Sequence, residues 1–501
     1  MDNRLFLGDN LDILRRHVKN DSVDLIYLDP PFKSNKAYNV IFKEKNGAQS
    51  GSQIEAFKDT WSWDKSSAEA FEEIVVSGPD DVSRLMQALR QFLGASDMMA
   101  YLAMMAPRLL ELRRVLKDTG SIYLHCDPTA SHYLKLLMDA VFGRERFLNE
   151  IVWSYEAGGR SKRHFGRKHD TILLYGASSR HYFNGNAVRI EMKAGKTSFG
   201  GRLREDESGR KYREVWGTGR KKLYRYYLDE GKVPEDVWQM PSIQSQDRER
   251  LGYPTQKPEA LLERIVKASS GPGDVVLEPF CGCGTAIVVA ERLGRNWIGI
   301  DVTPLAINAV RSRLQQAFGP DGWYDVDGLP KTLPDAEKLA EEDRYKFELW
   351  ALGLAGASEQ RHKKKGADKD IDGRLYFYDE GPNAQTKQIV VQVKSGHVVP
   401  SQIRDLVGVL DRENAQIGAF ITLHQPTQKM QEEAAAAGFY MSPVFQKKYP
   451  RIQILTIEAL LAGSRIDYPA GTTHVGKQAR RSRAQARQRD IQAGTEGEES
   501  D

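Results

Sequence analysis

Two short motifs, far apart in the chain, constrain the fold more than any other feature of this sequence. Asp29-Pro30-Pro31-Phe32 follows the apolar run 23–28, and Glu278-Pro279-Phe280-Cys281-Gly282-Cys283-Gly284-Thr285 follows the apolar run 275–277. Both runs are short and rich in strand formers, which is typical of strands buried on both faces of a parallel sheet. Ligand-binding clefts form beyond the carboxyl ends of such strands. The sequence therefore predicts that the two motifs meet at one edge of a sheet.

Helices and strands alternate around both motifs. Apolar residues recur at three- and four-residue steps in segments that we expect to be helices, namely 98–117, 132–142, 285–293 and 304–318. Short apolar runs predict further strands at 121–124, 171–175 and 297–300. This β-α-β order predicts an α/β fold of the Rossmann-like kind, with a mostly parallel sheet.

The chain is long enough for more than one domain, since 501 residues correspond to about two to four. We expect a first domain over 1–322, and prolines and glycines predict a linker at 323–340. Helix and strand patterns resume over 341–464 and predict a second, smaller α/β domain. The tail 465–501 is charged and lacks apolar residues to bury, so we expect it to be disordered.

Composition excludes several classes of protein. No apolar run approaches the roughly 18 residues of a membrane span, and the first residues lack the apolar core of a signal peptide. We therefore expect no membrane partner. The three cysteines are too few for a disulfide scaffold and indicate a reducing compartment, so a cytoplasmic location is expected. The net charge of +4 is too small to indicate nucleic-acid binding by itself.

The second motif has the layout of a nucleotide-binding corner. Gly282 and Gly284 would let the backbone approach a ligand closely, and Asp301 ends the next predicted strand, where an acidic residue meets ribose hydroxyls. Glu278 can accept a hydrogen bond from an ammonium group. The full G-x-G-x-x-G fingerprint is missing, which disfavours NAD. Cys281 and Cys283 lack the four-ligand spacing of structural zinc and fit small residues in a tight turn.

The first motif suits a nucleobase that has been swung out of a helix. The Asp29 carboxylate and the Pro30 carbonyl can both accept hydrogen bonds from an exocyclic amino group, which favours attack by its nitrogen. Pro30 and Pro31 would stiffen the turn, and Phe32 offers a flat face for stacking. The alternative is that the motif is only a rigid strand-to-loop turn.

With these residues, the chain resembles the β class of amino-group DNA methyltransferases over about residues 3–318. In that family the catalytic block precedes the donor block, with a recognition region between them, and this sequence has the same order. The second motif corresponds to the donor block. Four further blocks carry the resemblance: Gly8-Asp9-Asn10, Asp29-Pro30-Pro31-Phe32, Lys168-His169-Asp170 and Pro254-Thr255-Gln256-Lys257-Pro258.

The resemblance implies roles for individual residues. It makes Asp29, Pro30, Pro31 and Phe32 the catalytic, base-binding residues. It also implies S-adenosylmethionine as the methyl donor, bound by two sets of residues. Phe280, Gly282, Gly284 and Asp301 would line its pocket together with Glu278, while Asp9, Thr255 and Lys257 would approach it. Aspartate in the first catalytic position favours adenine N6, since cytosine N4 enzymes more often carry serine there.

The segment of about 183–250 is expected to recognise double-stranded DNA. It mixes basic and aromatic side chains, which bind phosphates, read guanine edges and stack on bases. The basic residues are Arg202, Arg204, Arg210, Lys211, Arg213, Arg220, Lys221, Lys222 and Arg225. A solvated insertion is the alternative. Trp61 and Trp63 suit either the DNA side or the core of their own insertion.

In the second domain, Asp372 precedes one predicted strand, and Gln392 and Lys394 end another. This layout resembles the Mrr-like branch of the PD-(D/E)xK nucleases, in which glutamine replaces the usual acidic residue. The resemblance implies a catalytic site of Asp372, Gln392 and Lys394, with Mg²⁺ held by Asp372 and the Val393 carbonyl. Asp368 and Asp370 are rival positions for the metal carboxylate. An inactive, DNA-binding domain is the alternative.

The sequence thus predicts a DNA adenine-N6 methyltransferase joined to an Mrr-like, Mg²⁺-dependent endonuclease, as in restriction-modification. One alternative is a cytosine-N4 methyltransferase with a non-cleaving DNA-binding domain. Another is an RNA or small-molecule methyltransferase with the same donor fold. The sequence leaves a homodimer open.

Overall fold

The computed structural model describes most of the chain, and residues outside these ranges are not discussed. Described are 3–31, 37–43, 49–58, 61–155, 163, 165–191, 203–216, 223–244, 246–251, 253, 255–319, 323–359, 371–377, 379 and 387–469. The chain divides into two compact units, one of residues 1–40 with 55–328 and one of residues 41–54 with 329–501. Among the described residues, no helix is long and apolar enough to cross a membrane.

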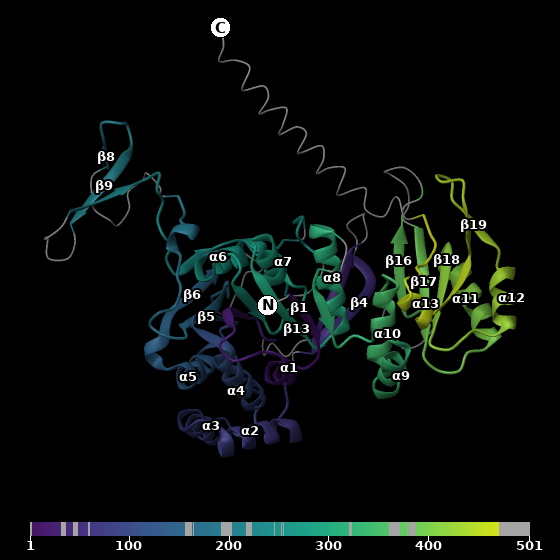
Figure 1. The fold of residues 1–501 in the computed structure, drawn as a ribbon, viewed down its shortest axis with the longest axis horizontal. Coiled ribbons are helices and arrows are strands. Elements are labelled where there is room, and N and C mark those ends of the chain that lie inside the picture. Colours follow the sequence, from purple (N-terminus) through teal and green to yellow (C-terminus); the bar gives the residue numbers. More distant parts are fainter. Residues whose placement is uncertain are drawn as a thin grey trace, which may run out of the picture. The chain divides into compact units, whose positions relative to one another are not determined.

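The first unit is built on a nine-stranded sheet with the order β11-β6-β7-β5-β2-β12-β13-β1-β14 (Figure 1). Among these strands, β7 alone runs antiparallel to its neighbours. The strands are β1 (Arg4–Leu7), β2 (Val23–Leu28), β5 (Leu116–Cys126), β6 (Phe147–Ser154), β7 (His169–Gly176), β11 (Val237–Gln239), β12 (Val275–Glu278), β13 (Asn296–Asp301) and β14 (Asp325–Asp327).

Helices cover both faces of this sheet. The helices α6 (Glu259–Ser269), α7 (Thr285–Arg292) and α8 (Pro304–Phe318) lie on one face, and α1 (Asn10–His17), α4 (Asp97–Val115) and α5 (Ser131–Phe142) lie on the other (Figure 1). Two further helices, α2 (Lys65–Ser77) and α3 (Asp80–Leu93), pack beside α4. The central strands are apolar on both faces because helices bury each of them, as expected for a parallel sheet.

The strands that end in the two motifs are direct neighbours. In the β2–β12 pair, Leu25 lies beside Val276 and Ile26 beside Leu277. The chain continues from β12 to one side of this pair and from β2 to the other, so the pair is the point at which the strand order reverses. Open α/β sheets bind ligands in the crevice at such a point.

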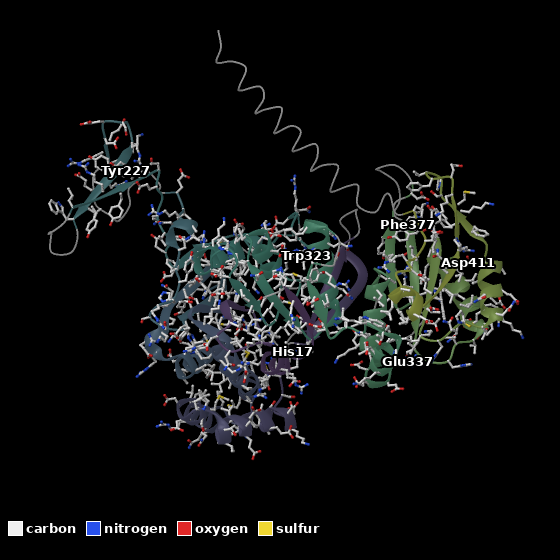
Figure 2. The ribbon with its side chains drawn as sticks, in the orientation of Figure 1. His17, Tyr227, Trp323, Glu337, Phe377 and Asp411 are labelled. Atoms are coloured by element: carbon white, nitrogen blue, oxygen red, sulfur yellow. The ribbon has the colours of Figure 1, made fainter. Side chains whose placement is uncertain are left out.

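Two further sheets are small and antiparallel. β3 (Ala37–Lys43) pairs with β4 (Gln49–Lys58), and β9 (Lys211–Trp216) pairs with both β8 (Leu203–Glu205) and β10 (Leu223–Tyr227). Figure 2 labels Tyr227, whose ring centroid lies 5.5 Å from that of Tyr212. The segment that carries most of the predicted recognition residues is therefore an antiparallel ribbon.

The second unit has a five-stranded sheet with the order β15-β16-β17-β18-β21. Its apolar residues form one cluster on each face, and Figure 2 labels Phe377 in one of them. The strands are β15 (Ser358–Glu359), β16 (Gly373–Phe377), β17 (Lys387–Lys394), β18 (Ile417–Thr422) and β21 (Ile452–Thr456), besides the hairpin β19 (Phe439–Met441) and β20 (Lys448–Pro450). The helices are α9 (Leu333–Glu342), α10 (Arg344–Leu354), α11 (Pro400–Glu413), α12 (Gln428–Ala436) and α13 (Ile457–Leu461).

The predicted fold class, a Rossmann-like mostly parallel sheet plus a smaller α/β unit, is confirmed. Near residue 341, where the second domain was expected to begin, α9 ends and α10 follows, because the Asp343 carboxylate accepts hydrogen bonds from the Tyr345 and Lys346 amides and starts a new helix. The stretch 323–340, predicted as a linker, contains β14 and most of α9. Of the predicted tail, residues 470–501 lie outside the described residues.

Candidate active site

A cavity of about 530 Å³ lies in the first unit, at the carboxyl ends of β1, β2, β12 and β13. Asp29, Pro30 and Pro31 of the first motif line it. From the second motif, Glu278, Phe280 and Gly282 line the same cavity. The volume is in the range typical of sites for cofactors and small ligands. Two segments far apart in the sequence thus meet in one site, whereas Phe32 lies outside the described residues.

The other predicted donor residues divide into two groups. Asp9, Thr255, Lys257 and Asp301 line the cavity, whereas Gly284 does not. Gly284 has a φ of 70° and precedes α7, where a Cβ atom would lie 2.8 Å from the Val310 side chain. The turn requires a left-handed backbone conformation, which glycine adopts readily. The missing side chain also allows α7 to start close to α8.

The best-defined contact in the cavity joins Lys257 to Asp29. The Lys257 ammonium donates to Asp29 Oδ2 at 2.6 Å, and the two side chains are 8% and 16% exposed. The second carboxylate oxygen, Oδ1, is buried and has no hydrogen-bond partner among the described residues. A buried acceptor of this kind costs free energy unless a ligand supplies the donor. Lys257 therefore fixes Asp29 with one oxygen left for a ligand.

Glu278 is buried in the same cavity, and its Oε2 atom has no partner among the described residues. Burial raises its pKa well above the ordinary value, and the carboxylates of Asp29 and Asp301 raise it further. The opposing charges of Arg313 and Lys257 do not compensate. A positively charged ligand would stabilise the ionised form of Glu278, so the site favours a cation beside this carboxyl group.

Asp301 holds the glycine turn in place. Its Oδ2 atom accepts a hydrogen bond from the Gly282 amide at 2.9 Å, and its Oδ1 atom accepts from the amide and the hydroxyl of Thr303, each at 2.9 Å. Burial raises the pKa of Asp301. The carboxylate thus links the turn after β12 to the start of α8, and it lines the cavity beside both.

A polar network joins the end of β1 to the donor turn. Arg108 of α4 donates to Asp9 Oδ2 and to Asn10 Oδ1, both at 2.6 Å. Asn10 in turn donates to the Pro279 carbonyl at 2.8 Å, and Asp9 Oδ1 caps α1 by accepting from the Leu11 amide. Asp9 is therefore occupied by an ion pair and a helix cap, while it still lines the cavity.

Sequence reasoning missed several residues that line the cavity. They include Tyr27, Met104, Arg108 and Tyr253. Trp61, for which the sequence left two interpretations open, packs edge-on against Tyr101 and faces the cavity. Tyr253 lies over the donor turn, since a Cβ atom on Gly282 would be 3.4 Å from its ring. Proximity to a motif could have indicated Tyr253, but nothing in the helical pattern around Met104 and Arg108 could have indicated them.

The predicted residues of the second unit lie where the start of β16 meets the end of β17. The Asp372 Oδ2 atom accepts a hydrogen bond from the Val393 amide at 2.7 Å. Gly373 pairs with Val391, so Asp372 lies opposite Gln392, and Lys394 shares the face of Gln392 because side chains alternate along a strand. The rival aspartates Asp368 and Asp370 lie outside the described residues. Among the residues that are described, no group of three or more His, Cys, Asp or Glu could hold a metal ion.

Several basic residues of the antiparallel ribbon are paired with carboxylates. Arg204 and Arg225 contact Glu214, and Arg210 contacts Asp229 at 2.7 Å. Aromatic side chains remain exposed beside them, with Trp216 58% and Tyr226 49% accessible to solvent. The ribbon therefore offers aromatic surface together with arginines whose charge is partly balanced.

Comparisons with known proteins agree with this geometry. Residues 23–311 match the family model described as DNA methylase, which is more than half of the chain. The chain belongs to this DNA methylase family. Residues 339–447 match a second model, described as restriction endonuclease. The two resemblances found in the sequence, to amino-group DNA methyltransferases and to Mrr-like nucleases, are both confirmed.

The chain is similar to named DNA methyltransferases. The DNA adenine methyltransferase YhdJ of Escherichia coli is 30% identical over 67% of this chain and 92% of its own length. The type II methyltransferase M.EcaI of Enterobacter cloacae is 29% identical over 50% of this chain and 65% of its own length. A solved structure of the PvuII cytosine-N4-specific DNA methyltransferase is 14% identical, with a TM-score of 0.37, and covers 62% of this chain and 85% of that one.

The glycine turn yields a matched pair of variants. Gly284 and Gly294 have similar φ values of 70° and 73°, but an added Cβ atom would meet Val310 only at Gly284, and no atom lies within 4 Å of it at Gly294. We expect Gly294→Ala to lower the free energy of unfolding by about 1–2 kcal/mol and Gly284→Ala by about 2–4 kcal/mol. Denaturant unfolding measures both, and equal losses would contradict the packing argument.

Glu278→Gln should stabilise the protein in a pH-dependent way. Because the pKa of Glu278 is raised in the folded state, its contribution to stability is present at acidic pH and is lost as the pH rises through that value. We expect the variant to melt about 2–4 °C above the wild type near pH 8 and at the same temperature near pH 4. Glu69→Gln, on an exposed part of α2, is the control and should shift neither melting curve.

Proposed function

We propose that the first unit transfers a methyl group from S-adenosylmethionine to the N6 amino group of adenine in duplex DNA. The observation that carries this proposal is the Asp29 Oδ1 atom, which has no hydrogen-bond partner among the residues that the structure describes and lies in a cavity that the glycine turn after β12 also lines. Methyl transfer between two ligands needs both of them in one space, and alignment of this kind can lower a barrier by about 7–11 kcal/mol.

On the base side, Asp29 acts as a fixed hydrogen-bond acceptor. Lys257 holds Oδ2, so Oδ1 is available to one N–H bond of an exocyclic amino group. The carbonyl of Pro30, which lines the same cavity, would accept the other N–H bond. Accepting both N–H bonds localises the nitrogen lone pair, which is otherwise delocalised into the ring. Pro30 and Pro31 restrict the turn, so that both acceptors keep one direction.

On the donor side, the residues present fit a cationic nucleoside. Glu278 supplies a buried carboxyl oxygen, Oε2, that no described residue contacts by a hydrogen bond and that suits an ammonium group. The Asp301 carboxylate lies where ribose hydroxyls would bind. Gly282, Phe280, Thr255 and Asp9 line the same space. When bound, S-adenosylmethionine supplies an electrophilic methyl group on a positively charged sulfur. The buried carboxylates of this cavity stabilise such a charge.

Adenine is the favoured base for two reasons. Asp29 occupies the first position of the catalytic motif, and the relative YhdJ is named as a DNA adenine methyltransferase. Cytosine N4 has the same kind of amino group, so it remains the competing target. The exposed aromatic and basic side chains of β8, β9 and β10 favour a polynucleotide over a small molecule, because they can stack on bases and contact phosphates.

We further propose that the second unit cleaves DNA with Mg²⁺. The Val393 amide donates to Asp372, and the N–H and C=O groups of one strand residue point to the same side, so the Val393 carbonyl lies near this carboxylate. A carboxylate and a carbonyl oxygen are suitable Mg²⁺ ligands. Gln392 and Lys394 share one face beside them, where Lys394 would orient or activate the attacking water.

The methylation proposal is tested with Asp29→Ala. We expect labelled methyl transfer to duplex DNA to fall at least 1,000-fold, on the order of the loss of a key transition-state contact, while S-adenosylmethionine still binds in calorimetry. Asp81→Ala, on the exposed first turn of α3, should transfer methyl groups at the wild-type rate. Normal methylation by Asp29→Ala would refute the base-site assignment. Adenine and cytosine are distinguished by identifying the methylated base, and tRNA and free nucleosides serve as competing substrates.

The cleavage proposal is tested with supercoiled DNA and Mg²⁺. Wild-type protein should cut unmethylated or methylated DNA, and Lys394→Ala should lower the rate by at least about 100-fold. Lys387→Ala, at the other end of β17, is the matched control and should cut normally. If the wild type cuts neither substrate, the second unit is a DNA-binding domain without nuclease activity.

A further inference from the structure

A row of hydrogen-bonded polar side chains crosses the sheet of the first unit and ends at the cavity. The Tyr155 hydroxyl, just beyond β6, donates to Asp170 Oδ1 on β7 at 3.1 Å. The other oxygen, Oδ2, lies 3.2 Å from Nε2 of His125 on β5, and His125 Nδ1 lies 2.8 Å from the Tyr27 hydroxyl on β2. Tyr27 lines the cavity, two residues before Asp29. The row includes Asp170 of the Lys168-His169-Asp170 block, a residue that has no role in the methyl transfer proposed above.

These side chains are deeply buried. His125 is 0% exposed and Tyr27 is 1% exposed, and apolar residues of the core surround the strands that carry them. A polar group in such a place needs a partner for every proton, and a network that satisfies this condition has one defined arrangement. The arrangement of protons can therefore be worked out from the charges.

The charges fix the direction of each hydrogen bond. Burial raises the pKa of Asp170, but the hydrogen bond and the charge of His125, the charge of Lys257 and the hydrogen bond from Tyr155 together hold it below its usual value. Burial lowers the pKa of His125, as does the charge of Lys257. An ionised Asp170 accepts the Nε2 proton of a neutral His125, which leaves Nδ1 as an acceptor. The Tyr27 hydroxyl must then donate to Nδ1, and its oxygen lone pairs remain for a donor from the cavity.

We propose that Tyr27, oriented by His125 and Asp170, accepts the proton that the target amino group loses when it is methylated. This inference rests on the methyl transfer proposed above. The amino nitrogen uses its lone pair for the new N–C bond and is left with one proton too many. That proton passes to the Tyr27 oxygen while the hydroxyl proton of Tyr27 passes to His125 Nδ1. The products are a neutral methylated amine, a neutral tyrosine and an imidazolium ion paired with Asp170.

The remaining groups of the cavity fit this division of work. Asp29 is held by Lys257 through Oδ2, so its task is to orient the amino group through Oδ1. Burial and the nearby charges of Asp29 and Glu278 raise the pKa of Tyr27 well above its usual value, so the phenol is not ionised at rest and relays a proton instead. An amino nitrogen conjugated to a purine ring is strongly acidic once it carries the extra proton, so a weak base is sufficient. Tyr27 contacts the substrate, whereas His125 and Asp170 are positioning residues.

A matched pair of tyrosine variants tests the relay. Tyr123 lies beside Tyr27 in the β2–β5 pair and is equally buried, but its hydroxyl bonds Ser269 and it does not line the cavity. We expect Tyr27→Phe to lower the single-turnover rate of DNA methylation about 100-fold, with S-adenosylmethionine affinity unchanged. Tyr123→Phe should stay within about threefold of the wild type. An unchanged rate in Tyr27→Phe would overturn the relay, as would loss of donor binding in that variant. Absence of methylation by the wild type would instead refute the proposed function.

Asp170→Asn tests the positioning role without removing a ring. Tyr155 donates to the remaining oxygen, so the new amide nitrogen faces His125 Nε2 and forces the imidazole proton to Nδ1. Tyr27 would then have to turn its hydroxyl proton toward the cavity. We expect a rate loss like that of Tyr27→Phe with an unchanged KM for DNA, and nitrogen NMR of labelled histidine should report the tautomer change in His125. Tyr175→Phe, on the same strand as Asp170 but with its hydroxyl bonded to Asp139, is the control and should keep both the tautomer and the rate. If Asp170→Asn changes the tautomer but not the rate, the relay is wrong.

Discussion

The parallel pairing of β2 with β12 is the contact on which the active site depends. Each strand ends in a motif that does not form the cavity by itself. The main-chain hydrogen bonds between the two strands bring Asp29 and Glu278 into one cavity. Side-chain contacts then refine the geometry, chiefly the ion pair from Lys257 to Asp29 and the hydrogen bonds from Gly282 and Thr303 to Asp301. Positions fixed by main-chain hydrogen bonds of a buried sheet are rigid, which suits alignment of two reactants.

The sequence allowed the sheet and the two motifs to be predicted, because both depend on local patterns. Apolar runs such as 23–28 and 275–277 identify buried strands, and prolines or glycines identify the turns after them. The partners of these residues could not be predicted in the same way. The family resemblance places Lys257 near the methyl donor, and this stays a prediction, but it gave no indication that the Lys257 ammonium group contacts Asp29. The sequence around a single polar residue in an apolar strand or helix does not show which distant residue it will contact. For this reason no local pattern indicated the roles of Tyr27, His125 and Arg108.

The cavity holds its acidic groups at a cost in stability. Glu278 and Asp301 both have raised pKa values because burial disfavours their ions, and a buried oxygen of Asp29 has no partner among the described residues. Such strain is common where a protein is prepared to bind a charged ligand, because the ligand supplies the missing contacts. Burial of the surrounding apolar side chains offsets the unfavourable free energy of these buried acidic groups.

The order of strands has a consequence for how the protein is made. β12 and β13 lie in the middle of the sheet, between β2 on one side and β1 on the other, although they are among the last strands of the unit in the sequence. While the chain leaves the ribosome, β1 and β2 are complete early but have no strand to join them. The sheet can close only once residues 275–301 have emerged. Until then the growing chain exposes unpaired apolar strand edges, and Asp29 has no cavity to line.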